Sequence, residues 1–297
     1  MVPRHLIRFN QRERFGALLL FLTVLFNGTS GHGQRRPLAS SHDTQANCQL
    51  QSGGESTVLA VVGPQTLHLA DGRFVRLAEI LVPSSAFSGQ GFDPSLAATS
   101  YLRKTAVGQK VEVKFGGTQR DRYGIYIAHL YLAGEPRVWL QEGLVNSGFA
   151  EVLPQDDNHA CSQRLLALEE KARNEQRGHW SLALFKVLHA RDPRSILNLV
   201  QTYQIVEGKV DHASESGGRV TLHFGAENKY GFIAIIEPSA KKRFADKKAS
   251  GDWTSLSVRV RGWVERRRGP AVSVTQSEQI EFLQQDSSDA KLLKEGQ

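Results

Sequence analysis

The hydrophobic positions early in the segment 55–181 follow the alternating pattern of short β-strands. Three runs rich in β-branched and aliphatic residues are separated by polar turns, and the turn at 70–73 carries an Asp-Gly pair beginning at Asp71. An Asp-Gly pair between two apolar runs is typical of a tight hairpin. The predicted strands are residues 56–62, 66–69 and 74–82.

Helical spacing follows the third run. Asp93 and Pro94 are typical of a helix N-terminus, and Gly108 is positioned to end that helix. Five strands interleaved with helices are typical of an OB-fold barrel with helices around it. The further predicted elements are a helix at 95–106, strands at 110–115 and 125–132, and helices at 138–147 and 158–177.

A second set of strand patterns begins near residue 202. It contains five runs rich in β-branched and aromatic residues, with one helical stretch at 239–250 after the third. This order matches the first barrel, so residues 202–283 are predicted to form a second, smaller OB-like β-barrel, and the fold class is β-rich α+β. The predicted strands are residues 203–210, 218–224, 230–236, 256–264 and 271–274.

The remaining segments lack a core pattern. Four arginines between Arg4 and Arg14 precede an apolar run at 15–26, which is typical of a signal peptide over 1–30 and too short to span a bilayer comfortably. The alternative is an uncleaved anchor. We expect export to the periplasm or beyond, with no stable membrane span after cleavage. Predicted linkers cover 31–54 and 182–201, and a disordered tail covers 284–297.

Two cysteines, Cys48 and Cys161, are present. In an exported protein this number predicts a single disulfide between them. The alternative is two unrelated buried thiols.

The net charge does not by itself indicate a nucleic-acid surface on the first barrel. Residues 55–181 hold thirteen Lys and Arg against fourteen Asp and Glu, a net of −1, whereas residues 202–297 hold fifteen against thirteen, a net of +2. The excess positive charge therefore lies outside the first barrel.

Three phrases in the first barrel resemble the staphylococcal nuclease (thermonuclease) family. They are Val75-Arg76-Leu77-Ala78, Asp121-Arg122-Tyr123-Gly124 and Arg177-Gly178-His179-Trp180. Their order and spacing within residues 57–181 make the chain similar to that family. Residues 203–283 look like the accessory domain that often follows the nuclease domain in exported proteobacterial members.

The resemblance implies a site for phosphodiester hydrolysis. The family holds a calcium ion with two aspartates and adds a glutamate and two arginines, because calcium prefers carboxylate oxygens and arginine matches phosphate. Only one of the five positions keeps its residue type here, so we expect no calcium-dependent hydrolysis and no cofactor, with calcium required only if the family function survives. The positions are Gln65, Arg76, Leu81, Ser84 and Ile125, of which Arg76 is retained.

Neighbouring residues are weak substitutes for the missing groups. Glu79 is the nearest carboxylate, and we interpret it as an exposed strand residue rather than a replacement ligand. Arg76 either retains an anion-binding role or pairs with Glu79 or a loop carboxylate. Asp156, Asp157 and His159 cluster before the last predicted helix and are interpreted as a helix-capping segment.

The second unit offers basic and aromatic residues for a polyanion. With Trp253, they predict a surface for single-stranded DNA or RNA, and the alternative is a solvated hairpin. The candidate residues are Lys241, Lys242, Arg243, Arg266, Arg267, Arg268 and Trp263, with Lys247 and Lys248 nearby.

Three functions remain open at this point. The leading hypothesis is a binding module for nucleic acid that lacks the family's hydrolytic activity. The second is a weak or metal-independent nuclease that uses Arg76. The third is a structural protein of the cell envelope without nucleic-acid contact.

Overall fold

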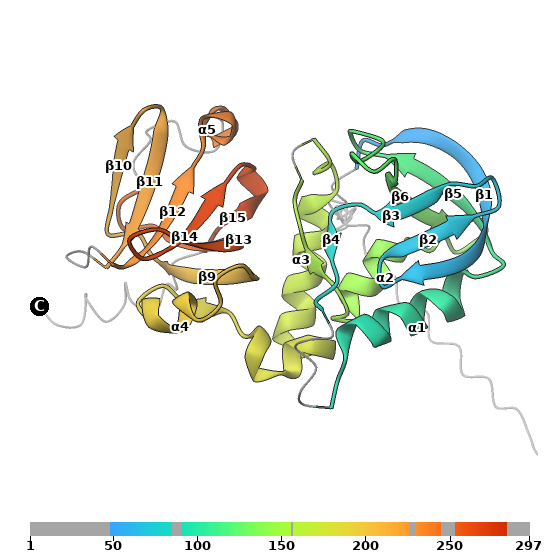
Figure 1. Ribbon diagram of the computed structural model, residues 1–297, viewed down its shortest axis with the longest axis horizontal. Helices are drawn as coiled ribbons and strands as arrows, with labels where there is room; N and C mark the ends of the chain where they lie inside the picture. Colours follow the sequence, from blue (N-terminus) through green and yellow to red (C-terminus); the bar gives the residue numbers. More distant parts are fainter. Residues whose placement is uncertain (1–47, 85–90, 156, 226–229, 245–252, 284–297) are drawn as a thin grey trace, which may run out of the picture. The chain divides into compact units, whose positions relative to one another are not determined.

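The computed structural model describes residues 48–84, 91–155, 157–225, 230–244 and 253–283. The predicted signal peptide, most of the first predicted linker and the predicted tail lie outside these residues. Residues 45–297 belong to one compact unit, which contains a closed barrel followed by a second, curled sheet (Figure 1).

The first barrel is closed by five strands, as the sequence predicts. The order is β1-β2-β3-β6-β5, and the long β1 pairs with β2 through its second half and with β5 through its first half. Only β3 and β6 run parallel. The strands are β1 Gln51–Gly63, β2 Thr66–Leu69, β3 Phe74–Leu77, β5 Lys110–Phe115 and β6 Tyr126–Leu132.

Three helices accompany this barrel. The first, α1 (Pro94–Ala106), begins where the sequence predicts, because the Asp93 side chain accepts a hydrogen bond from Leu96 N at 3.0 Å. The others are α2 (Leu140–Asn146) and α3 (Ser162–Asn174). Their buried side chains join the barrel interior in one hydrophobic cluster, which includes Leu67, Leu102, Leu130, Leu144 and Leu165.

Several predicted boundaries differ from the structure: for example, β1 begins at Gln51, inside the predicted linker 31–54, and short elements at Leu188–His189 and Pro193–Leu197 lie inside the predicted linker 182–201. The predicted strand at 74–82 is two strands, β3 and the short β4 (Ile80–Leu81), because Glu79 between them adopts a positive φ of 62° and breaks the ladder. The helix predicted from residue 158 begins at Ser162. Strand β4 pairs instead with β7 (Glu151–Val152), which places Leu81 opposite Glu151.

The second sheet repeats the connectivity of the first barrel. Its order is β10-β11-β12-β14-β13-β9-β8, with β15 paired to β13, and only β12–β14 and β8–β9 are parallel. The elements are β8 Leu188–His189, α4 Pro193–Leu197, β9 Tyr203–Lys209, β10 His212–Ser216, β11 Arg219–Phe224, β12 Phe232–Ile236, α5 Pro238–Phe244, β13 Ser257–Arg266, β14 Pro270–Val274 and β15 Ile280–Phe282.

The sheet curls because β9 and β10 are consecutive parts of one bent segment. Val210 N donates to Leu256 O beside β13, whereas Asp211 N donates to His223 O in β11. The bend between β9 and β10 therefore bonds to the segment before β13 on one side and to β11 on the other, as the long β1 pairs with β5 and β2 in the first barrel. The predicted helix at 239–250 is described as far as Phe244.

A buried arginine connects the sheet to α3. Arg261 in β13 is fully buried, and its guanidinium donates to both carboxylate oxygens of Glu169 at 3.0 and 2.8 Å. It also donates to Glu281 at 2.7 Å and to Val152 O at 3.2 Å. Tyr203 adds a hydrogen bond from its hydroxyl to Val152 O at 2.9 Å. These contacts fix β9 and β13 against α3 and β7.

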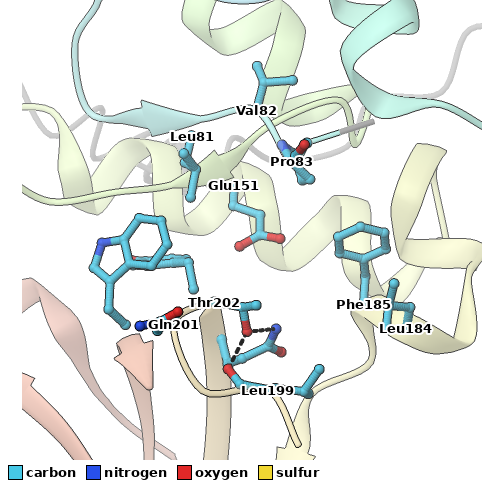
Figure 2. A pocket seen from close by; sticks show the side chains of 13 residues that line it. Leu81, Val82, Pro83, Glu151, Leu184, Phe185, Leu199, Gln201 and Thr202 are labelled. Atoms are coloured by element: carbon cyan, nitrogen blue, oxygen red, sulfur yellow. Dashed lines mark hydrogen bonds between the residues drawn. The ribbon is translucent and has the colours of Figure 1, made fainter. Parts of the chain in front are cut away.

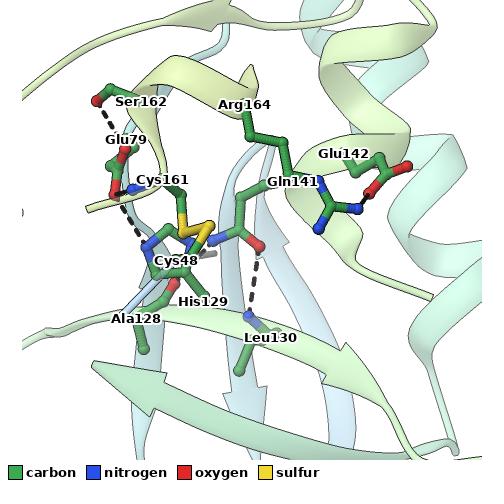
Figure 3. Close-up of a disulfide and its surroundings, with 10 residues drawn as sticks. All are labelled: Cys48, Glu79, Ala128, His129, Leu130, Gln141, Glu142, Cys161, Ser162 and Arg164. Atoms are coloured by element: carbon green, nitrogen blue, oxygen red, sulfur yellow. Dashed lines mark hydrogen bonds and ion pairs between the residues drawn. A yellow bond between two sulfur atoms is a disulfide. The ribbon is translucent and has the colours of Figure 1, made fainter. Parts of the chain in front are cut away.

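The predicted disulfide between Cys48 and Cys161 is confirmed (Figure 3). It joins the segment before β1 to the residue before α3, across a sequence separation of 113 residues. Across the described part of the chain, no helix combines the length and the apolar character that a membrane crossing requires.

Candidate functional site

Arg76, the retained arginine of the resemblance, forms an ion pair with a turn carboxylate. Its Nη2 lies 3.0 Å from Asp121 Oδ2, and the Asp121 side chain is only 11% exposed. The other oxygen of Asp121 accepts hydrogen bonds from Tyr123 N and Ile125 N, as expected for an aspartate at the start of a turn. Arg76 therefore pairs with a loop carboxylate, Asp121, and not with Glu79.

Gln65 lies in the turn between β1 and β2. Its side-chain oxygen accepts a hydrogen bond from Val82 N at 2.8 Å, and its backbone oxygen accepts one from Leu77 N. The amide oxygen that could face a cation is thus bonded to the segment that follows β4. Gln65 acts here as a connector between two parts of the barrel.

The structure brings the five positions of the resemblance close together. Gln65 accepts a hydrogen bond from Val82, which lies between Leu81 and Ser84 in the sequence. Arg76 pairs with Asp121, which also accepts a hydrogen bond from the backbone of Ile125. Leu81 and Ser84 both line a cavity described below. The five positions therefore lie near one another in the structure.

These residues do not fit a calcium ion. Calcium prefers several carboxylate and carbonyl oxygens. The carboxylate here, Asp121, is bonded to Arg76 and to two backbone N–H groups, and Leu81 has no ligand atom. Residues 85–90, which the structure does not describe, contain no Asp or Glu that could replace them.

The interpretation of Glu79 as an exposed strand residue is wrong. Its side chain is fully buried, and its carboxylate accepts hydrogen bonds from Cys161 N at 2.9 Å and Ser162 Oγ at 2.7 Å (Figure 3). His129 Nε2 lies 3.2 Å from the same carboxylate. The break in the strand at Glu79 turns this side chain inward to the start of α3, away from Arg76.

The capping role predicted for the segment 156–159 is also wrong at Asp157. This carboxylate accepts hydrogen bonds from Thr118 N at 2.7 Å and Thr118 Oγ1 at 2.6 Å, so it anchors the loop after β5 rather than α3. These bonds lower the pKa of Asp157 against the opposing effect of burial, which is the largest single influence. Asp156 lies outside the described residues.

The basic residues of the second sheet form two separate groups. The turn group, Arg266–Arg268, precedes Pro270 at the start of β14, and Arg266 is paired with Pro270. The helix group, Lys241–Arg243 in α5, follows β12, whose last residue is level with Val274 at the end of β14. The two groups therefore lie at opposite ends of β14 and do not form one surface.

The surroundings of the two groups also differ. In the helix group, Lys241 bonds to Glu215, and Arg243 Nη1 lies 3.3 Å from His159 Nε2. All three arginines of the turn group are exposed, and Arg267 has an ion pair with Glu265 at 3.1 Å.

Aromatic residues separate in the same way. The predicted role of Trp253 as a surface aromatic is wrong, because it is 5% exposed and packs against Phe244 and Phe282. By contrast, Trp263 is 50% exposed and Tyr230 is 55% exposed. Lys247 and Lys248 lie outside the described residues.

A cavity lies where the two-stranded sheet of β4 and β7 faces β9 and β13 of the second sheet (Figure 2). It has a volume of about 270 Å³. Its position could not be predicted from the sequence, because its walls come from five separate stretches of the chain. They are Leu81–Ser84, Glu151, Leu184 and Phe185, Leu199 with 201–204, and Trp263.

Glu151 is the acidic group in the wall of this cavity. Burial raises its pKa to about 8, and the nearby Glu169 adds to this increase, while Arg261 and Arg173 oppose it. Glu151 is therefore mainly protonated at neutral pH and can donate a hydrogen bond. His179 Nε2 lies 3.7 Å from Glu151 Oε1, and burial lowers the pKa of His179 to about 4.

Replacing Glu151 with glutamine is expected to raise the free energy of unfolding at about pH 8 and to change it little at about pH 4. In the unfolded chain this carboxyl titrates near 4.5, whereas in the folded protein it titrates near 8. The folded state therefore retains a proton between these values, and the wild-type protein loses stability as the pH rises through this window. Glutamine cannot ionise, so the variant avoids this loss.

Urea unfolding of Glu151→Gln and the wild type at both pH values measures the effect. The exposed Glu170 in α3 provides the control, since Glu170→Gln makes the same chemical change on the protein surface. An equal effect of Glu151→Gln at both pH values would contradict the prediction.

The chain was compared with known proteins. No curated protein sequence matches the chain. Residues 74–182 match the family model described as staphylococcal nuclease homologue, and this stretch runs from β3 to the end of the Gly178–Ser181 3-10 helix. Residues 74–182 are therefore similar to staphylococcal nuclease homologues and form a staphylococcal-nuclease-like (thermonuclease-like) domain.

Proposed function

We propose that this protein binds single-stranded nucleic acid and lacks calcium-dependent phosphodiesterase activity. The observation that carries the second part is the ion pair between Arg76 and Asp121, beside positions held by Gln65 and Leu81. An arginine that is already neutralised by a carboxylate stabilises a phosphate-centred transition state poorly. Loss of one electrostatic contributor costs on the order of 10²- to 10³-fold in rate.

The binding function is supported by the thermonuclease-like domain and by the turn group. Arg266–Arg268 project from the turn between β13 and β14, and a Cβ placed on Gly269 would lie 2.3 Å from Tyr230 O. The turn that carries these arginines therefore lies close to the backbone of Tyr230, whose side chain is 55% exposed, and follows β13, the strand that carries Trp263. Cations that follow a backbone together with exposed aromatic rings are typical of surfaces that bind single strands.

Export is part of the proposal. The disulfide between Cys48 and Cys161 supports an oxidising compartment, since such bonds persist mainly outside the cytosol. The periplasm or the extracellular medium is the expected location.

The mature protein is expected to leave single-stranded and plasmid DNA uncut in calcium, and to show no calcium binding by calorimetry. Loss of the carboxylates at Gln65 and Leu81 is the reason. Incubation with calcium and with chelator, followed by electrophoresis, measures cleavage. Robust cleavage that Arg76→Ala abolishes would establish the rival function, a metal-independent nuclease.

Removing the turn group is expected to weaken binding of single-stranded DNA and to reduce its salt dependence. Each lost phosphate contact lowers the slope of log K against log[salt] by about 0.7, so Arg266→Ala/Arg267→Ala/Arg268→Ala should lower it by about 2. Fluorescence anisotropy over a salt series measures this slope.

The matched control is Lys241→Ala/Lys242→Ala/Arg243→Ala, which removes the same charge from α5. It should change the slope less, because Lys241 and Arg243 already contact Glu215 and His159. If both triple variants change the slope equally, binding depends on the overall positive charge and not on the turn group. Undetectable binding of the wild type at low salt would favour a structural role in the envelope.

A further inference from the structure

We propose that the cavity between Glu151 and Trp263 receives one unstacked nucleobase of the bound single strand. This inference rests on the proposed function and adds a site to it. The cavity is separate from the Arg76–Asp121 pair, although Leu81 and Ser84, two positions of the resemblance, line it.

The size of the cavity suits a single ring system. Sites for drug-sized molecules usually occupy roughly 300 to 1,000 Å³. This cavity, at about 270 Å³, lies just below that range. A base attached to a strand that remains outside needs no more space than this.

The walls offer a ring for stacking. Trp263 is half exposed, and it contacts Tyr203 edge to face, with ring centroids 5.7 Å apart. An edge-to-face contact leaves an indole face for another planar group. Every nucleobase has such a planar face, so stacking on Trp263 would be tolerant of sequence.

The lining favours a neutral ligand that can form hydrogen bonds. No lysine, arginine or histidine is among the described lining residues, and Glu151 is the acidic one. Its raised pKa of about 8 keeps it mainly uncharged at neutral pH, so it can donate to a base carbonyl or ring nitrogen.

Further polar groups are held in place by bonds to one another. Gln204 Nε2 donates to Thr202 Oγ1 at 3.0 Å, and Thr202 Oγ1 donates to Leu199 O at 2.5 Å (Figure 2). This arrangement leaves the second amide hydrogen and the carbonyl oxygen of Gln204 for a base edge. The described lining has no cationic side chain that could bind a bare phosphate.

The cavity and the turn group lie on one strand. Trp263 and Arg266 are three residues apart in β13, which corresponds to about 10 Å along a strand. Side chains three positions apart on a strand point to opposite faces, so a bound strand must pass around the end of the β13–β14 hairpin to contact both Trp263 and Arg266. Leu81, where the family has an aspartate, provides an apolar wall that does not repel the phosphates.

The test compares a short oligothymidylate with an abasic deoxyribose-phosphate oligomer of the same length. Fluorescence anisotropy at low salt should give the wild type an affinity at least about fivefold higher for the oligothymidylate, the factor expected for one stacked base. Trp263→Ala should remove this preference and leave abasic binding unchanged. Trp263→Phe, which keeps an aromatic ring, should retain most of it.

A second arm uses pH. Above about pH 8 Glu151 ionises, and the wild type should lose part of its preference for the base, whereas Glu151→Gln should keep it. The groups that act on Glu151 are Glu169, Arg261 and Arg173, with His179 and Tyr203 beside it. The arginines remain charged at this pH, and the low pKa of His179 keeps its ring neutral.

Different failures have different meanings. Equal wild-type affinity for the two oligomers, or equal weakening of both by Trp263→Ala, would overturn the base site and leave nucleic-acid binding intact. Absence of wild-type binding to either oligomer would overturn the proposed function, and the base site with it.

Discussion

Replacing Arg261 with methionine is expected to lower the free energy of unfolding by about 3–5 kcal/mol, the usual cost of breaking a buried ion pair by removing one partner. Arg261 and Glu169 are both fully buried. The substitution leaves the Glu169 carboxylate without its bidentate partner and leaves Glu281 without one of its two arginines. Methionine fills much of the volume, so the loss is mainly electrostatic.

Other groups can recover only part of this energy. Arg173 contacts the same Glu169 carboxylate, and Val152 N donates to Glu169 Oε1 at 2.7 Å. Burial is the largest single influence on the pKa of Glu169 and raises it, but these contacts and Arg261 together outweigh burial and hold the pKa below its ordinary value. Without Arg261, protonation of Glu169 becomes easier, and the variant should be least destabilised at low pH.

Urea unfolding of the oxidised protein near neutral pH measures the loss. The control is Arg219→Met, because Arg219 pairs with Glu237 at 2.7 Å but has a side chain that is 57% exposed. Exposed pairs contribute about 0–1 kcal/mol. A loss below about 1 kcal/mol for Arg261→Met would contradict the buried pair as a main connection between β13 and α3.

Strands with a clear apolar pattern could be predicted from the sequence. Both OB-type orders followed from the alternation of β-branched residues and from the position of one helix after the third strand. Strand β10 was missed because all five of its residues, His212–Ser216, are exposed or half-buried and mostly polar. Strand β15 was missed because three residues are too few for a period.

Burial of charged residues could not be predicted in the same way. Alternation in Val258-Arg259-Val260-Arg261 indicates apolar residues inward and arginines outward. The arginine face of β13 instead packs on Glu169 and Glu281, so Arg261 is as buried as Val260. A single sequence contains no sign that α3 supplies a matching carboxylate. The cavity was missed for the same reason, since Glu151 and Trp263 meet only through this packing.

Removing the disulfide is expected to be at least as costly as removing Arg261. The double variant Cys48→Ala/Cys161→Ala should lose about 4–5 kcal/mol of unfolding free energy, the chain-entropy value for a closed loop of roughly 100 residues. The separation of 113 residues places this bond in that range. Because the bond restricts the unfolded chain, its removal should also increase the urea m-value, since a less restricted chain exposes more surface.

The native state adds a second reason for this cost. Cys161 is 1% exposed, and its backbone N–H donates to the buried Glu79 carboxylate, which lies beside His129 (Figure 3). Loosening of residue 161 would weaken this hydrogen bond and leave a buried carboxyl oxygen without one of its donors, which lowers the stability of the folded state. Reduced wild type should therefore match the double variant, and reductant should not destabilise that variant further. A large loss of stability with an unchanged m-value would place the effect in the Glu79 network rather than in the unfolded chain.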